Sequence, residues 1–271
     1  MELKRVVITG IGALTPIGNN ASDYFDSLKK GVSGSAPITR FNAEKFKTKF
    51  ACEVKGFDVE QHMHRKDARK LDIFAQFAMV TADEAVLDSG MDLEKIDTDR
   101  IGVIWGAGIG GLKTLQDECQ YFFEGDGTPK FNPFFIPKMI ADIAAGHISI
   151  KYGFRGPNFA TVSACASSTN ALIDAFNYIR LGKANAILAG GSEAAVTETG
   201  IGGFNALHAL SQNNDSPKTA SKPFDKNRNG FVLGEGSGAI MLEEYDHAVA
   251  RGAKIYAEVV GGGASGDAHH I

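Results

Sequence analysis

A single cysteine, Cys165, lies in the stretch FATVSACASSTNALIDAF, where a β-type run passes into a helical pattern. The unpaired N–H groups and the positive macrodipole end at the first turn of a helix stabilise a thiolate, which is the nucleophilic form of cysteine. The small neighbours Ala164, Ala166, Ser167 and Ser168 leave room for a substrate carbonyl, and the same N–H groups can hold its oxyanion. We therefore expect Cys165 to be a nucleophile; the alternative is a buried structural cysteine.

Short β-branched runs alternate with amphipathic stretches around this cysteine, which is the order of strand-helix-strand units on a largely parallel sheet. The predicted strands cover residues 3–9, 100–105, 158–163, 184–189, 238–243 and 254–260. Helices are predicted over 69–89 and 137–152, and from just after Cys165 to Gly182. The chain shows no internal repeat and no linker, so we expect one α/β domain.

The composition excludes several classes of function. A chain of 271 residues with 44% hydrophobic and 22% charged residues is typical of a globular protein, and a net charge of −4 gives no general attraction to nucleic acid or to anionic membranes. No signal peptide and no apolar stretch of about 18 residues is present, which predicts a cytoplasmic protein. Three cysteines without a CxxC pair, and the histidine pairs His62/His64 and His269/His270, indicate neither a disulfide framework nor a metal site.

Gly106, Gly108 and Gly111 satisfy GxGxxG after a predicted strand and before a plausible helix. This is the best argument for a rival interpretation, a dinucleotide-binding oxidoreductase. That fold also needs an acidic residue about 20 positions further on, at the end of a second strand. Glu124 and Asp126 instead lie in the turn-like EGDGTP, which disfavours the rival.

Five segments, in order, resemble the β-ketoacyl-acyl carrier protein synthases of bacterial fatty acid synthesis, and specifically their type II branch. They are GIGG (108–111), NPFFIPKMI (132–140), SACASST (163–169), AGGSEA (189–194) and KPFDKNRNGFVLGEGSGAIMLEE (222–244). The resemblance covers the whole chain and implies a thiolase-like fold, with a mixed, largely parallel sheet and helices on both faces. It makes residues 1–253 an N-terminal half and 254–271 the opening strand of a C-terminal half that is not present.

The resemblance implies an acyltransferase that needs no cofactor. Cys165 takes a fatty acyl chain from acyl carrier protein, and malonyl-acyl carrier protein then loses carbon dioxide and lengthens the chain by a Claisen condensation. By position, Ile109, Phe135 and Phe204 correspond to the acyl pocket; the alternative for each is core packing. The family's two catalytic histidines match none of the seven here, so we expect these 271 residues not to condense alone. A third interpretation is therefore a truncated half that only dimerises or binds the carrier.

Arg65, Lys66, Arg69 and Lys70 are predicted at the start of the 69–89 helix, where the macrodipole disfavours cations by ~0.3–1 kcal/mol each. Charges placed against this penalty suggest binding of an acidic carrier protein, with Lys130 as a weaker addition; a solvated basic face is the alternative. The resemblance also implies a homodimer that pairs through the strand GPNFATVSA (156–164). We assign no role to His270.

Overall fold

The computed structural model describes residues 3–269, and within them the main sheet has six strands. Their order is β5 (Asn158–Thr161), β4 (Ile101–Gly106), β6 (Ala186–Glu193), β7 (Gly236–Glu244), β1 (Val6–Leu14) and β8 (Ala257–Val259). β4 is parallel to β5 and β6, whereas β7 is antiparallel to both β6 and β1, and β8 to β1. Strands β1, β4, β5 and β6 therefore share one direction, and β5 and β8 form the two edges.

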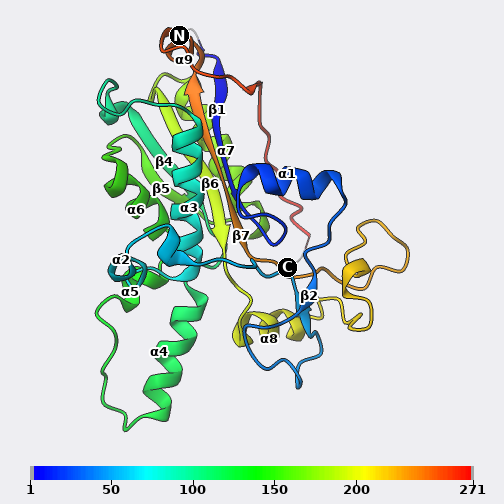
Figure 1. Cartoon of the computed structure of the whole chain (residues 1–271). Helices are drawn as coiled ribbons and strands as arrows, with labels where there is room; N and C mark the ends of the chain where they lie inside the picture. The colour runs from blue at the N-terminus through cyan, green and yellow to red at the C-terminus, as the bar shows by residue number, and fades with distance from the viewer. Residues whose placement is uncertain (1–2, 270–271) are drawn as a thin grey trace.

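Helices cover both faces of this sheet, as Figure 1 shows. Side chains of a strand alternate between faces, and β4 follows this rule: Val103 and Trp105 join one core cluster with α3 and α6, whereas Ile104 joins a second cluster with α7. The helices are α1 (Ala21–Lys29), α2 (Arg65–Ala68), α3 (Ile73–Asp88), α4 (Leu112–Glu124), α5 (Phe135–Met139), α6 (Ile143–Tyr152), α7 (Ser167–Arg180), α8 (Glu198–Ala206) and α9 (Tyr245–Ala250). The expected α/β architecture is confirmed.

Smaller elements complete the chain. β2 (Ala36–Pro37) and β3 (Phe50–Ala51) form a separate two-stranded sheet, and 3-10 turns cover Val59–Gln61, Thr98–Arg100, Ala164–Ala166 and Pro217–Thr219. None of the helices in residues 3–269 has both the length and the apolar character to cross a membrane.

The prediction of one helix over 137–152 is wrong, because residues 140–142 separate α5 from α6. Ile140 is extended, with φ −67° and ψ 142°. A distant loop explains the break: the backbone N–H of Gly111 donates to the carbonyl of Met139 at 3.0 Å, a carbonyl that a continuing helix would use itself. A tertiary contact has replaced a local hydrogen bond.

The predicted 69–89 helix begins later than expected, and this changes the argument about its cations. α3 starts at Ile73, and Asp72 caps it by accepting a hydrogen bond from the N–H of Phe74 at 3.3 Å. Arg65 and Lys66 belong to the separate helix α2, and Arg69 and Lys70 follow that helix. These cations therefore lie outside the first turn of α3, and the penalty expected from the macrodipole of that helix does not apply to them.

A buried charge cluster fastens α9 to the sheet. Glu243 of β7 is fully buried and accepts hydrogen bonds from Thr9 Oγ1 at 2.9 Å and from Arg251 Nε and Nη2, both at 2.7 Å. The ring of His247 is 2.6 Å from the same carboxylate. Burial acts to raise the pKa of Glu243, but the hydrogen bonds from Arg251 and His247 outweigh it and lower that pKa.

Candidate functional site

Cys165 lies in the 3-10 turn between the end of β5 and the start of α7, so the predicted strand-to-helix position is confirmed, and its side chain is exposed. Ala164 adopts the left-handed region with φ 48°, which costs a non-glycine residue about 1–2 kcal/mol. Hydroxyl groups hold the turn: Ser167 Oγ accepts from the N–H of Ser163 at 2.9 Å and donates to the carbonyl of Ala164 at 2.7 Å. Thr161 Oγ1 donates to the carbonyl of Ser167 at 2.7 Å. The strained turn presents the thiol outward.

No side chain caps the N-terminus of α7. The amides of its first turn are therefore not taken by a side-chain acceptor, and the positive end of a helix of 14 residues lies beside Cys165. This arrangement suits a thiolate, and it suits the oxyanion that forms when a thiolate attacks a thioester carbonyl.

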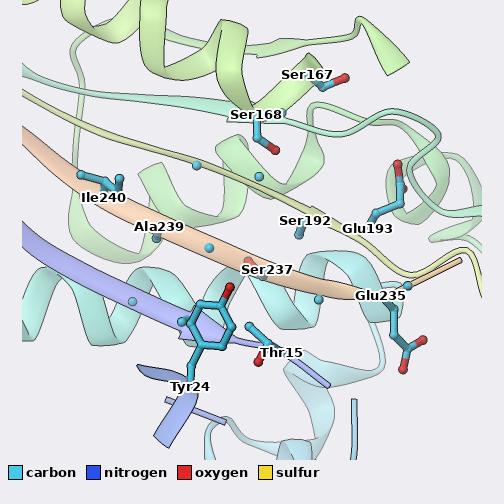
Figure 2. Close-up of a pocket in the computed structure, with 18 of the residues that line it drawn as sticks. Thr15, Tyr24, Ser167, Ser168, Ser192, Glu193, Glu235, Ser237, Ala239 and Ile240 are labelled. Carbon is cyan, nitrogen blue, oxygen red and sulfur yellow. The ribbon is translucent and has the colours of Figure 1, made fainter. Parts of the chain in front are cut away.

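A cavity of about 1380 Å³ opens beside the thiol, larger than the ~300–1,000 Å³ of common ligand sites. In Figure 2, Ser168 of α7 lies above β7 and Tyr24 of α1 lies below it. Ile240 lies on the left of the view, and Glu193 and Glu235 lie on the right. Glycines, alanines and larger apolar side chains make up most of the wall. The site is therefore a roomy, mostly apolar space with the Cys165 thiol at its edge.

The structure brings two of the three predicted pocket residues to this cavity. Ile109 and Phe204 line it together with Cys165. Phe135 is not among the lining residues; it begins α5 and stacks on Phe131 at 5.5 Å between ring centroids. Phe231, which the sequence reasoning did not select, also lines the cavity and meets Phe204 edge to face at 5.4 Å. Phe231 lies in the segment KPFDKNRNGFVLGEGSGAIMLEE (222–244), so the resemblance of this segment could have pointed to it.

The partly buried carboxylate of Glu193 is the second feature that sequence reasoning missed. Its Oε2 accepts the N–H of Ile109 at 2.8 Å and its Oε1 accepts the N–H of Gly110 at 3.0 Å. Burial raises the pKa of Glu193, against the opposing effect of these amide hydrogen bonds. Its position at the carboxyl end of β6 was the available signal, because the ends of parallel strands meet at one edge of a sheet.

This carboxylate also argues against the dinucleotide interpretation. The expected strand, glycine loop and helix are all present, as β4, residues 107–111 and α4. In a dinucleotide site the loop and the helix N-terminus face a pyrophosphate. Here the loop amides donate to Glu193, and a Cβ on Gly106 or Gly111 would lie 2.5 Å or 2.4 Å from backbone atoms of other segments. The glycines permit close packing of the chain on itself.

The predicted carrier-binding cations are exposed or half-exposed, but they are not equivalent. Lys70 pairs with Asp67 at 2.8 Å and Arg65 with Glu60 at 3.5 Å. Lys66 and Arg69 have no ion pair within residues 3–269. Lys130 is exposed in the loop between α4 and α5, which projects from the body of the molecule (Figure 1).

Among residues 3–269, the histidines show no grouping that would hold a metal. His64 Nδ1 accepts the N–H of Lys66 at 3.1 Å, and His62 stacks on Phe57. His147 is partly buried in α6, and burial, followed by the charge of Lys70, lowers its pKa. Residues 3–269 contain no cluster of three or more His, Cys, Asp or Glu side chains suited to a metal ion. His270 lies outside the described residues.

Comparisons with known proteins agree with this geometry. The profile of the family described as "Beta-ketoacyl synthase, N-terminal domain" matches residues 3–248. The 3-oxoacyl-[acyl-carrier-protein] synthase 2 of Synechocystis sp. is 48% identical over 271 residues, which are 100% of this chain and 65% of that protein. The chain thus spans slightly less than two thirds of this curated relative, and the resemblance read from the five sequence segments is confirmed.

Solved structures confirm the fold. A β-ketoacyl synthase from Burkholderia phymatum STM815 superimposes with a TM-score of 0.88 at 32% identity, over 98% of this chain and 65% of that one. A type II polyketide synthase ketosynthase bound to the hexaketide, in complex with its acyl-carrier protein (AntDE:AntF), gives a TM-score of 0.76 at 25% identity, over 95% of this chain and 67% of that one.

Proposed function

The chain belongs to the β-ketoacyl synthase family, and from this premise we propose that Cys165 accepts a fatty acyl chain from acyl carrier protein as a thioester. The Cys165 thiolate attacks the thioester carbonyl, and the negative charge moves to the carbonyl oxygen beside the first-turn amides of α7. The intermediate then collapses. A new carbon–sulfur bond to Cys165 remains, and the carrier leaves as a thiolate that takes up a proton.

One observation carries this proposal: an exposed thiol at an uncapped helix N-terminus opens on a large apolar cavity. The helix end stabilises the charged forms of both nucleophile and intermediate, while the cavity removes the hydrocarbon chain from water at ~0.8 kcal/mol for each buried CH₂ group. Ile109, Phe204 and Phe231 supply apolar wall near the thiol. We keep Phe135 as a pocket residue only as a prediction.

We propose that the complete protein then performs the condensation. Malonyl-acyl carrier protein loses carbon dioxide, its carbanion forms a carbon–carbon bond with the acyl carbonyl, and the Cys165 thiolate leaves. Decarboxylation needs hydrogen-bond donors for the charge on the malonyl thioester oxygen. No histidine in residues 3–269 lines the cavity. We infer that these donors come from the third of the relatives that this chain does not span.

A second candidate function is a half that binds its partners without condensing, and the 65% coverage of the relatives favours it. In this proposal residues 1–253 form the N-terminal half and 254–271 begin a second one. The position of β8 supports that boundary, since β8 adds to the edge of the sheet beside β1 and its outer edge is unpaired within the described residues.

We further propose acyl carrier protein as the partner and a homodimer in the cytoplasm as the working state. The solved complex of a related ketosynthase with its acyl-carrier protein supports the partner, and Lys66 and Arg69 are the cations best placed to meet its acidic surface. The dimer proposal is supported by β5, an edge strand followed by Val162 with 63% of its surface exposed.

Intact-mass measurement tests the acyl transfer. The protein is incubated with palmitoyl-acyl carrier protein, and we expect one added acyl group on the parent and none on Cys165→Ala. Cys119→Ala is the matched control, because Cys119 is a free but only partly exposed thiol in α4. Acylation that survives Cys165→Ala, or that is lost in Cys119→Ala, would refute the assignment.

Adding malonyl-acyl carrier protein to the acylated protein separates the two candidates. Release of carbon dioxide together with a 3-oxoacyl product shows condensation by these 271 residues. A stable acyl-enzyme without either product supports the non-condensing half.

A further inference from the structure

Glu193 occupies a position that the acyl-transfer chemistry does not explain. It ends β6 and lines the same cavity as Cys165, but no step of the proposed reaction uses a carboxylate of the protein. Its two oxygens are used by the loop of residues 107–111, each accepting one backbone N–H from Ile109 or Gly110. Hydrogen bonds to a charged acceptor are among the stronger ones in proteins.

The loop is held on its other side as well. The N–H of Gly111 donates to the carbonyl of Met139, and a Cβ on Gly110 would lie 2.9 Å from that carbonyl. Gly110 has φ 83°, which glycine adopts without strain. The loop is therefore clamped between the end of α5 and Glu193, and Ile109 lies at its middle.

Ile109 connects this clamp to the cavity. It lines the cavity, and 43% of its surface is exposed, so neighbouring residues cover only part of this side chain. Its backbone N–H is one of the two bound by Glu193. Movement of this backbone would carry the side chain with it and change the space beside the thiol.

We propose that Glu193 is a positioning residue that holds the backbone of Ile109 and Gly110, fixes the Ile109 side chain in the cavity wall and so limits the length of acyl chain that Cys165 accepts. This inference rests on the acyl transfer proposed above. It concerns the selection of the substrate and leaves the chemical step to Cys165.

The variant Glu193→Gln tests the role because it keeps the size of the side chain. A glutamine amide has one oxygen acceptor, and its NH₂ group can only donate. One loop amide then faces a donor and loses its partner. We expect faster hydrogen exchange of the peptide that contains residues 107–112, and a rise of about tenfold in the ratio of palmitoyl to hexanoyl transfer onto Cys165.

Glu53→Gln is the matched control. Glu53 is buried, and its Oε1 accepts two backbone N–H groups, from Thr39 at 2.9 Å and Arg40 at 3.1 Å. It does not line the cavity. A glutamine oxygen can keep both of these backbone hydrogen bonds, and we expect the control to leave the palmitoyl to hexanoyl ratio unchanged.

The outcomes distinguish this inference from the proposed function. If the parent protein is not acylated, the proposed function fails and the ratio has no meaning. If the parent is acylated but Glu193→Gln leaves the ratio unchanged, or Glu53→Gln shifts it equally, the positioning role is refuted. Should Glu193→Gln not fold, Ile109→Ala must raise the same ratio, and an unchanged ratio there also overturns the inference.

Discussion

The contact between β4 and the turn that carries Cys165 provides a sharp test of the site's geometry. A Cβ on Gly106 would lie 2.5 Å from the carbonyl carbon of Ser167 and 2.5 Å from the nitrogen of Ser168. Ordinary contact begins at 3.4 Å, so the two backbones must separate by about 0.9 Å. Both atoms are backbone, and no side chain can rotate away to relieve the clash.

Gly106→Ala should therefore displace the first turn of α7. Overpacking costs about 1–3 kcal/mol, and the smaller entropy of the unfolded alanine chain offsets about 0.4–1 kcal/mol of this. We expect a net loss of about 1–2 kcal/mol in the free energy of unfolding. A displacement close to 1 Å at a reacting group lowers rates by about 100-fold, so acylation of Cys165 should slow much more than stability alone suggests.

Urea denaturation and the initial rate of acylation by palmitoyl-acyl carrier protein measure the two effects. Gly146→Ala is the control: Gly146 lies within α6, and its Cβ would meet nothing within 4 Å. That change should stabilise the protein by about 0.5–1 kcal/mol and leave the rate unchanged. A Gly106→Ala protein with the parent's denaturation midpoint and acylation rate would refute the packing argument.

Three further predictions address the rest of the molecule. The pKa of Glu243 is lowered in the folded protein, so ionised Glu243 contributes stability above its unfolded pKa, and this contribution is lost as the pH falls through its folded pKa. Glu243→Gln should therefore lower the free energy of unfolding by about 3–5 kcal/mol near neutral pH. Denaturation curves over a pH series should show that the variant loses less stability with falling pH than the parent. Lys66→Glu with Arg69→Glu should weaken binding of labelled acyl carrier protein in anisotropy titrations, most strongly at low salt, whereas Lys45→Glu, an exposed control, should not. Ala164→Val should destabilise the protein by more than about 1 kcal/mol in thermal unfolding, whereas Ala164→Gly, which relieves the positive φ, should stay within about 1 kcal/mol of the parent.

The sequence predicted those features that depend on neighbouring residues. The helix after Cys165 and the turn that carries the thiol follow from local hydrophobic periodicity, and the structure confirms them. Each of the six predicted strands overlaps an observed one, although the first was predicted over 3–9 and runs over Val6–Leu14. The break at residues 140–142 did not follow, because its cause is the N–H of Gly111, nearly thirty residues away. The start of α3 was also misplaced, although Asp72 is a recognisable cap, because the apolar pattern was extended back through the cations before it.

The residues of the site divide in the same way, into those that neighbouring sequence identifies and those that depend on distant segments. Cys165, Ile109 and Phe204 could be selected because each lies in a recognisable segment, and the structure gathers all three around one cavity. The role of Glu193 could not be selected in this way. That role depends on which backbone amides lie near the Glu193 carboxylate once β4 and β6 pair side by side. The register of this pairing, which places Gly106 beside Gly191, is set by the whole sheet and not by residues near Glu193 in the sequence.

Gly106 and Gly108 explain how Cys165, Ile109 and Glu193 come to lie close together. β4, β6 and the turn before α7 converge at one end of the sheet, and there the Cα of Gly106 faces the backbone of residues 167–168, while the Cα of Gly108 faces both Glu193 and the carbonyl of Ala164. A side chain at either position would push the turn that carries the thiol away from the loop that carries Ile109. The GxGxxG pattern that suggested a nucleotide site is thus accounted for by the close approach of three backbones. That approach places the Cys165 thiol, the loop that carries Ile109 and the Glu193 carboxylate bound to this loop within one shared set of contacts.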